Sequence, residues 1–189
     1  MSDPINISLP KERNLYFTTH VDQDSIAKLT KDIISINDHD RYLERWYKIH
    51  NLKYKADAIK IYIDSYGGQV YQILGLIGII EKSRTPIHTI VTGCAMSAGF
   101  VLLISGHKRF AYQYATMMYH QVASDHWGKL EHIKQGFREA KRLDKLLNKF
   151  ILEKTKLNKE LTKSVNKMKQ DWYLTPEQSL KFGIINKIL

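Results

Sequence analysis

Residues 58–68 read AIKIYIDSYGG, and this stretch decides the fold. Its first part, residues 58–63, is rich in isoleucine and predicts a strand, and residues 69–82 predict an apolar helix. Between them, Gly67 and Gly68 permit positive φ and close backbone approach, so their N–H groups can face a ligand. The alternative is a plain turn from strand to helix. No lysine followed by Ser or Thr comes after these glycines, which excludes a phosphate-binding loop.

A second unit repeats this order further along the chain. Residues 87–91 (IHTIV) predict a buried strand, residues 92–95 a turn, and residues 97–104 an apolar helix. Short strands are expected at 15–18, 109–112 and 116–119, and a first helix at 25–36. Alternating strands and helices favour an α/β fold with its sites at the carboxyl ends of the strands.

The chain beyond Gly128 is helical in pattern for a long way. Apolar residues recur at steps of three and four, which predicts one helix over about residues 128–156, roughly 40 Å long. A helix of this length is expected to project from the body and to pack against another subunit. Further on, Thr175 and Pro176 begin a capped helix, Gly183 ends it, and residues 184–189 predict a final edge strand.

Residues 38–55 are polar and aromatic, and no element is assigned to them as a whole. Tyr42, Trp46 and Tyr47 fit one face of a helix, which we interpret as a cover for the core rather than a ligand site.

Composition indicates one globular domain, residues 1–189, with 43% apolar residues. A single cysteine, Cys94, excludes a disulfide within the chain and a cysteine-rich zinc site. No apolar run reaches the ~20 residues that cross a bilayer, and the first residues contain no signal peptide pattern. We expect a soluble, cytoplasmic protein.

The net charge of +10 suggests a nucleic-acid or acidic partner. Thirteen of the basic residues fall within 129–169 against five acidic ones. Most are lysines that spread around the polar arc of the predicted helix, as on a solvated helix. We therefore favour a compositional bias of the genome toward lysine as the source of the positive charge. The alternative is a module that binds nucleic acid or an acidic partner through this basic helix.

Three polar residues could carry chemistry. Ser97 lies between a strand and the start of a helix, where backbone N–H groups can stabilise a developing oxyanion. Taken alone, however, an ordinary N-cap is the most common role for a serine before a helix. His120 closes an apolar strand and could be its base or an edge histidine. Spacing does not select the carboxylate partner, but Asp171 precedes the apolar turn WYLT that anchors it.

In order, the segments IYIDSYGG, GCAMSAGF, MMYHQ and QDWYLTPEQSLKFGIIN resemble the ClpP family of self-compartmentalising serine peptidases. The resemblance covers about residues 12–189. It implies a ClpP/crotonase-type α/β fold of repeated strand–helix units with a long protruding handle helix. By position in these motifs, it implies Ser97 as nucleophile, His120 as general base and Asp171 as the residue that orients the imidazole. Gly68 and Ala98 match the backbone donors of the family's oxyanion hole.

The resemblance also implies partners. These are a peptide or unfolded-protein substrate, further copies of the chain in stacked rings of six or seven (12 or 14 subunits), and a Clp-type unfoldase ATPase. No metal or cofactor is implied. The short segment before the first strand, about 12 residues, departs from the family and leaves the ATPase partner an open question.

Two further departures concern the substrate groove and the region 38–55. Tyr66 and Val122 stand where the family usually has proline, and residues 38–55 are longer than the family pattern. The favoured function is a serine endopeptidase inside a ring assembly. The alternatives are a catalytically silent ClpP-like structural subunit and the basic-helix binding module, while a crotonase-type acyl-CoA enzyme would not explain a Ser, His and Asp set.

Overall fold

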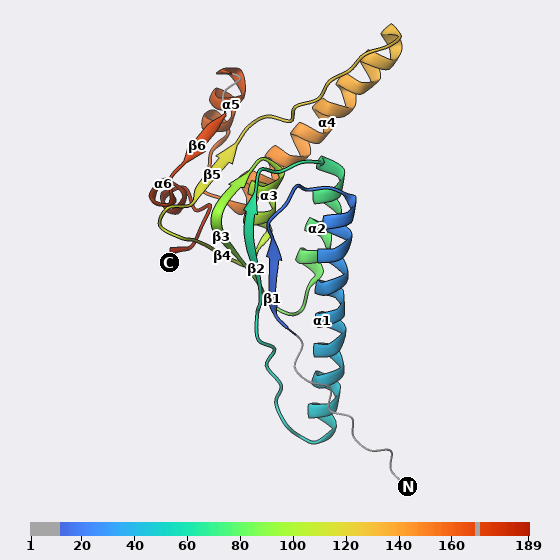
Figure 1. Cartoon of the computed structure of the whole chain (residues 1–189), viewed down its shortest axis with the longest axis vertical. Helices are drawn as coiled ribbons and strands as arrows, with labels where there is room; N and C mark the ends of the chain where they lie inside the picture. Colours follow the sequence, from blue (N-terminus) through green and yellow to red (C-terminus); the bar gives the residue numbers. More distant parts are fainter. Residues whose placement is uncertain (1–11, 169–170) are drawn as a thin grey trace.

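The computed structural model describes residues 12–168 and 171–189, without the side chains of residues 166–168, and is built on a seven-stranded sheet (Figure 1). Five strands run parallel in the order β1, β2, β3, β4, β7. The strand β5 adds in parallel to the end of β3, and β6 pairs antiparallel with β5. The bounds are β1 Asn14–Phe17, β2 Ile59–Ser65, β3 Ile87–Met96, β4 Lys108–Ala111, β5 Thr116–Tyr119, β6 Trp172–Leu174 and β7 Lys187–Ile188.

The described helices are α1 (Gln23–Ile49), α2 (Val70–Lys82), α3 (Ala98–Ser105), α4 (Leu130–Lys154), α5 (Lys159–Met168) and α6 (Pro176–Lys181). In Figure 1, α1 and α2 lie side by side along one face of the sheet. The helix α3 is buried along its whole length, so it forms the centre of the core beneath β3. The α/β fold that the sequence predicts is therefore confirmed.

The strand β3 is longer than expected, and the turn predicted at residues 92–95 is wrong. The strand continues to Met96 because Cys94 to Met96 pair with β5 after the first half of β3 has paired with β4. The Asp64 carboxylate also accepts a hydrogen bond of 2.9 Å from the backbone N–H of Cys94. These contacts hold the end of β3 extended, so the chain turns only at Ser97.

The helix α1 is also longer than expected, since it continues through residues 38–49. The aromatic residues there do not cover the core: Tyr42 is 57% exposed, and Trp46 and Tyr47 are half-buried outside the core cluster. They pack locally instead, with the ring of Trp46 4.1 Å from that of His50. This half of α1 projects beyond the sheet (Figure 1).

A buried carboxylate joins the projecting half of α1 to the body. Asp40 accepts hydrogen bonds from Arg13 (2.5 and 2.9 Å), Tyr54 (2.6 Å) and Thr85 (2.6 Å). Burial by itself raises the pKa of Asp40, but these donors outweigh it and hold that pKa below the usual value. The charged carboxylate thereby ties α1 to the segments before β1, β2 and β3.

The helix α4 has 25 residues and two different halves. Leu143, Leu147 and Ile151 are buried against the body, whereas Leu130 and Phe137 are 66% and 64% exposed. In Figure 1 the exposed half rises well clear of the sheet. The predicted projecting helix is confirmed, and only part of its apolar stripe is covered by its own chain.

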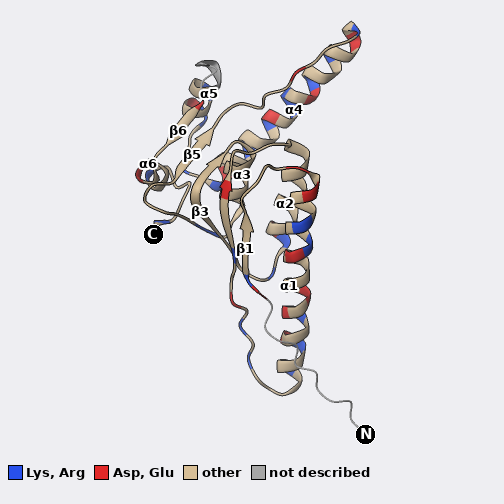
Figure 2. Ribbon diagram, viewed as in Figure 1, with Lys and Arg blue, Asp and Glu red and all other residues tan. Residues whose placement is uncertain are grey.

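Basic and acidic residues are interspersed along α4, as Figure 2 shows. Three basic residues form ion pairs with acidic neighbours one turn away: Lys134 with Glu131, Arg142 with Glu139, and Lys149 with Glu153. This is the pattern of a solvated helix rather than of a continuous basic face.

The C-terminal segment follows the sequence expectation with a shorter strand. The Thr175 hydroxyl accepts from the backbone N–H of Gln178 at 3.3 Å, which completes the predicted cap of α6. The strand β7 has two residues and pairs with β4 at the edge of the sheet. The expectation about the segment before the first strand lies outside the described residues, which begin at residue 12. In the part of the chain that is described, none of the helices has the length and apolarity of a membrane span.

Candidate active site

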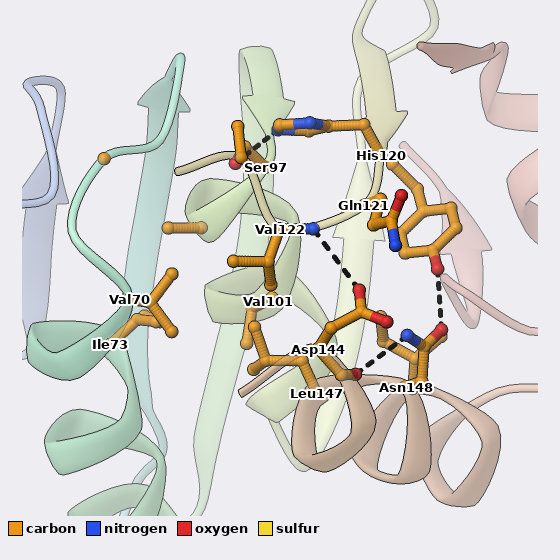
Figure 3. Close-up of a pocket in the computed structure, with 15 residues that line it drawn as sticks. Val70, Ile73, Ser97, Val101, His120, Gln121, Val122, Asp144, Leu147 and Asn148 are labelled. Carbon is orange, nitrogen blue, oxygen red and sulfur yellow. Dashed lines mark hydrogen bonds between the residues drawn. The ribbon is translucent and has the colours of Figure 1, made fainter. Parts of the chain in front are cut away.

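Ser97 stands at the junction of β3 and α3 in an unusual backbone conformation, with φ 52° and ψ −118°. It occupies the N-cap position of α3, as the N-cap interpretation expects, but its side chain makes no capping hydrogen bond. The hydroxyl oxygen lies 2.8 Å from Nε2 of His120 instead. The turn thus points the hydroxyl away from the helix and toward an imidazole (Figure 3).

His120 reaches Ser97 because β5, which it follows, is the parallel neighbour of the end of β3. The backbone N–H of Ser97 donates to the carbonyl of Met118 at 2.9 Å, which fixes the two strand ends. With the proton on Nδ1, Nε2 of His120 can accept the hydroxyl proton. The structure therefore brings together the first two residues of the predicted set.

The backbone of the third predicted residue, Asp171, lies near that of His120, but in the described structure no hydrogen bond joins their side chains. Tyr119 pairs with Trp172 across the antiparallel β5–β6 ladder, so Asp171 is opposite His120 at the end of that ladder. Its side chain is exposed. Within residues 12–168 and 171–189, no hydrogen bond joins Asp171 to His120.

The two predicted backbone donors lie beside Ser97. Ala98 is the first residue of α3, so its N–H has no acceptor within that helix. Gly67 has φ +99°, and a Cβ there would come within 2.6 Å of the Met96 carbonyl oxygen, so the glycine turn packs directly on the serine turn. Val21 holds this turn, accepting from Gln69 at 2.7 Å and donating to Gly67 at 2.8 Å. Gly68, between these two, lines the same cavity as Ser97 and Ala98.

That cavity has a volume of about 190 Å³ and opens beside the serine and histidine (Figure 3). Its wall is largely apolar, with Val70, Ile73, Val101, Leu147 and Ile151 among its residues. Four residues in the wall with polar groups were not predicted as site residues: Tyr119, Gln121, Asp144 and Asn148. Asp144 follows the buried Leu143 on α4, and this position next to the apolar stripe is a signal for it in the sequence, but it does not show that the carboxylate borders the cavity.

Two other chemistries have no support in this region. Among the described residues, no group of three or more His, Cys, Asp or Glu side chains could hold a metal ion. The nearby Cys94 is buried. Its burial, and to a smaller extent its hydrogen bond with Asp64, raise the pKa of its thiol to about 11. A thiol with that pKa is protonated at neutral pH and is a poor nucleophile.

A serine at a strand-to-helix junction, hydrogen-bonded to a histidine at the end of the neighbouring strand, has the geometry of a serine hydrolase on an α/β fold. The sequence itself is more specific. Residues 3–189 match the model of the Clp protease family, and the chain belongs to that family.

Two relatives of known name are Clp protease subunits, in agreement with this family. It is 32% identical over 133 residues to the ATP-dependent Clp protease proteolytic subunit of Deinococcus radiodurans, a match that spans 69% of this chain and 64% of the relative. It is equally similar over 133 residues to the ATP-dependent Clp protease proteolytic subunit 1 of Prochlorococcus marinus, spanning 67% of that relative. The chain thus spans about two thirds of the length of these relatives.

The fold is also that of a solved family structure. A mutant of ClpP1 from Listeria monocytogenes superposes with a TM-score of 0.76, covering 94% of this chain and 91% of that one at 22% identity. The ClpP-type fold expected from the sequence is therefore confirmed.

Proposed function

We propose that this protein is a serine endopeptidase that cleaves peptides or unfolded proteins by acyl transfer. The observation that carries the proposal is the 2.8 Å contact between the Ser97 hydroxyl and Nε2 of His120, in a member of the Clp protease family. The contact lies at the mouth of a cavity large enough for one side chain. No metal or cofactor is needed for this chemistry.

The mechanism follows from the positions of these groups. His120 takes the hydroxyl proton as Ser97 attacks the peptide carbonyl, and the N–H groups of Gly68 and Ala98 stabilise the oxyanion. The imidazolium then gives its proton to the leaving amine, and water releases the acyl group by the same steps.

Asp171 is proposed to orient His120 through Nδ1, which requires its exposed carboxylate to turn toward the ring. We propose that assembly supplies this change. The exposed apolar half of α4 suits a contact between two rings of six or seven subunits, and such rings would enclose the active sites. Because both curated relatives are named ATP-dependent, a Clp-type unfoldase is the proposed source of substrate.

The second candidate is a structural subunit that assembles without cleaving. The observation in its favour is the exposed position of Asp171, which forms no hydrogen bond with His120 in the part of the chain described. Such a subunit would keep the fold and the rings but would lack an activated serine.

Labelling of the full chain with a fluorophosphonate, followed by peptide mapping, separates the two candidates. We expect modification at Ser97, its loss in Ser97→Ala, and its retention in Ser164→Ala, which removes an exposed hydroxyl on α5. In parallel, Ser97→Ala should leave less than ~1% of the turnover of short fluorogenic peptides. An assembled wild type that neither labels nor cleaves is the structural subunit.

A further inference from the structure

We infer that Asp144 makes the cavity beside Ser97 select a basic side chain, Lys or Arg, on the substrate residue whose carbonyl is attacked. The inference rests on the proposed peptidase function and concerns its specificity. The cavity includes Ser97, Ala98 and Gly68, so a carbonyl held at the serine and the two N–H groups would direct its own side chain into this space.

Asp144 is the one carboxylate in the described cavity wall. It rises from α4, half-buried, and Figure 3 shows its carboxylate reaching toward the backbone nitrogen of Val122. That N–H donates to Oδ1 at 3.3 Å, a long hydrogen bond. An ionised carboxylate can accept about four hydrogen bonds, so most of its capacity is open to a ligand.

In the part of the chain that the structure describes, no cation neutralises the charge of Asp144. Across the described residues, none of the salt bridges includes Asp144, although α4 carries many lysines and arginines. The neighbouring amide is already committed, because Asn148 donates to the backbone carbonyl of Asp144 at 2.8 Å and accepts from the Tyr119 hydroxyl at 2.7 Å. The carboxylate is therefore the strongest acceptor that the wall offers to a substrate.

The rest of the wall fits the stem of a long basic side chain. Val70, Val101 and Leu147 supply apolar contact from three helices, and the volume of about 190 Å³ suits one extended side chain. Lys and Arg bury an apolar stem and keep a charged head for an acceptor. The cavity wall matches this with apolar side chains for the stem and the Asp144 carboxylate for the head. A purely aliphatic side chain would leave the half-buried carboxylate without a cationic partner, and a Glu side chain would be repelled.

The test is cleavage of three peptides that differ only in the residue before the scissile bond: Lys, its uncharged near-isostere norleucine, and Glu. For wild type we expect kcat/KM for the Lys peptide to exceed that for the norleucine peptide, and the Glu peptide to be the poorest. In Asp144→Asn the ratio of Lys to norleucine should fall about tenfold or more, because a charge-assisted contact is lost. Asp144→Glu should keep a ratio above one.

Glu153→Gln is the matched control, since it removes the same charge from an exposed position on the same helix and should leave the ratio unchanged. If Asp144 only holds the backbone of Val122, Asp144→Asn will slow both peptides in proportion, and that constant ratio overturns the inference. A wild type that cleaves the norleucine peptide at least tenfold better than the Lys peptide overturns it even if the variants do not fold. In both cases the peptidase function stands. Failure to cleave any of the peptides, together with no fluorophosphonate labelling, refutes the function and the inference with it.

Discussion

The backbone N–H of Ser97 donates a hydrogen bond of 2.9 Å to the carbonyl oxygen of Met118, two residues before His120. This bond joins the end of β3 to β5, so the serine hydroxyl and the imidazole meet at 2.8 Å although 23 residues separate them. The same turn gives Ser97 a positive φ of 52°, a backbone angle that residues other than glycine rarely adopt. Ser97, the proposed nucleophile, is thus held in a strained conformation by the strands around it.

That strain predicts an order of stability among variants of Ser97. We expect Ser97→Gly to be more stable to urea than Ser97→Ala by about 1 kcal/mol. Glycine adopts a positive φ without strain, whereas alanine is strained there as serine is. Both lack the hydroxyl, so the comparison separates backbone strain from the lost contact with His120. Equal urea midpoints with equal slopes would show that the turn stores no strain.

The glycine turn predicts a larger effect at Gly67. A Cβ at this position would lie 2.6 Å from the Met96 carbonyl oxygen and 2.8 Å from the Ala98 nitrogen, both of them backbone atoms. Gly67→Ala should therefore destabilise the fold by about 1–3 kcal/mol and reduce peptidase turnover, because it displaces the serine turn.

Gly75→Ala is the control for that substitution. Gly75 lies within α2 with open space at its Cβ, and alanine is the better helix former by about 1 kcal/mol. Thermal unfolding should show a gain in stability for Gly75→Ala and a loss for Gly67→Ala. A neutral Gly67→Ala would mean that the two turns are not in contact in solution.

Much of this arrangement follows from local sequence. The isoleucine-rich strand before Gly67 and the apolar segment after Ser97 specify two strand–helix units, and the hydrophobic period of α1 predicts which residues are buried: Ile26, Leu29, Ile33 and Ile36. The proposed third residue of the site required more than local pattern. Spacing along the sequence could not select Asp171, and only the family resemblance pointed to it.

The sequence could not predict features that depend on pairing between distant segments. The strand β3 continues through Gly93 because β5 and Asp64 hold it, and neither contact is visible in the local pattern, which indicates a turn. Likewise, Asp144 lies in a helix whose period shows a buried stripe but not which polar neighbour borders the cavity. Tertiary pairing overrides local propensity at both places.

The proposed orienting residue has its own prediction. Asp171→Asn should lower kcat for short peptides by about two to four orders of magnitude, because an amide favours the wrong imidazole tautomer. Asp57→Asn, another exposed carboxyl, should not change kcat. If the assembled Asp171→Asn enzyme keeps kcat within threefold of wild type, then Asp171 stays in its exposed position and does not orient His120.

The buried Asp40 predicts a dependence of stability on pH. Burial opposes its charge, but hydrogen bonds from Arg13, Thr85 and Tyr54 lower its pKa in the folded protein below the ordinary value. A lowered folded-state pKa contributes stability at pH values above the unfolded pKa of about 3.9. That contribution is lost as pH falls through the folded-state pKa. We expect Asp40→Asn to cost about 2–3 kcal/mol near neutral pH, where an ionic network is broken.

Urea denaturation at several pH values checks this. The difference in unfolding free energy between wild type and Asp40→Asn should be largest near pH 7 and should shrink as pH falls below about 4. Asp38→Asn is the control, because Asp38 pairs with Arg41 on the surface with its side chain 60% exposed, and it should change stability by less than ~0.5 kcal/mol. A constant difference from pH 7 to pH 3 would exclude the charge of Asp40 as the cause.

The exposed half of α4 predicts that assembly and activity are coupled. Leu130 and Phe137 are 66% and 64% exposed, and burying each of them in a contact between rings would contribute about 1.5–3 kcal/mol. If the chain assembles into the proposed particles of 12 or 14 subunits, Phe137→Asp should convert them into single rings, as measured by native mass spectrometry at micromolar concentration. Gln135→Asp adds the same charge at an exposed position two residues away and should leave the double ring intact.

Since α4 also carries Asp144 and Leu147 into the cavity wall, loss of the ring contact should reduce peptidase turnover as well. Single rings of Phe137→Asp with full activity would show that each subunit completes its site alone, whereas double rings that persist in this variant would place the interface elsewhere.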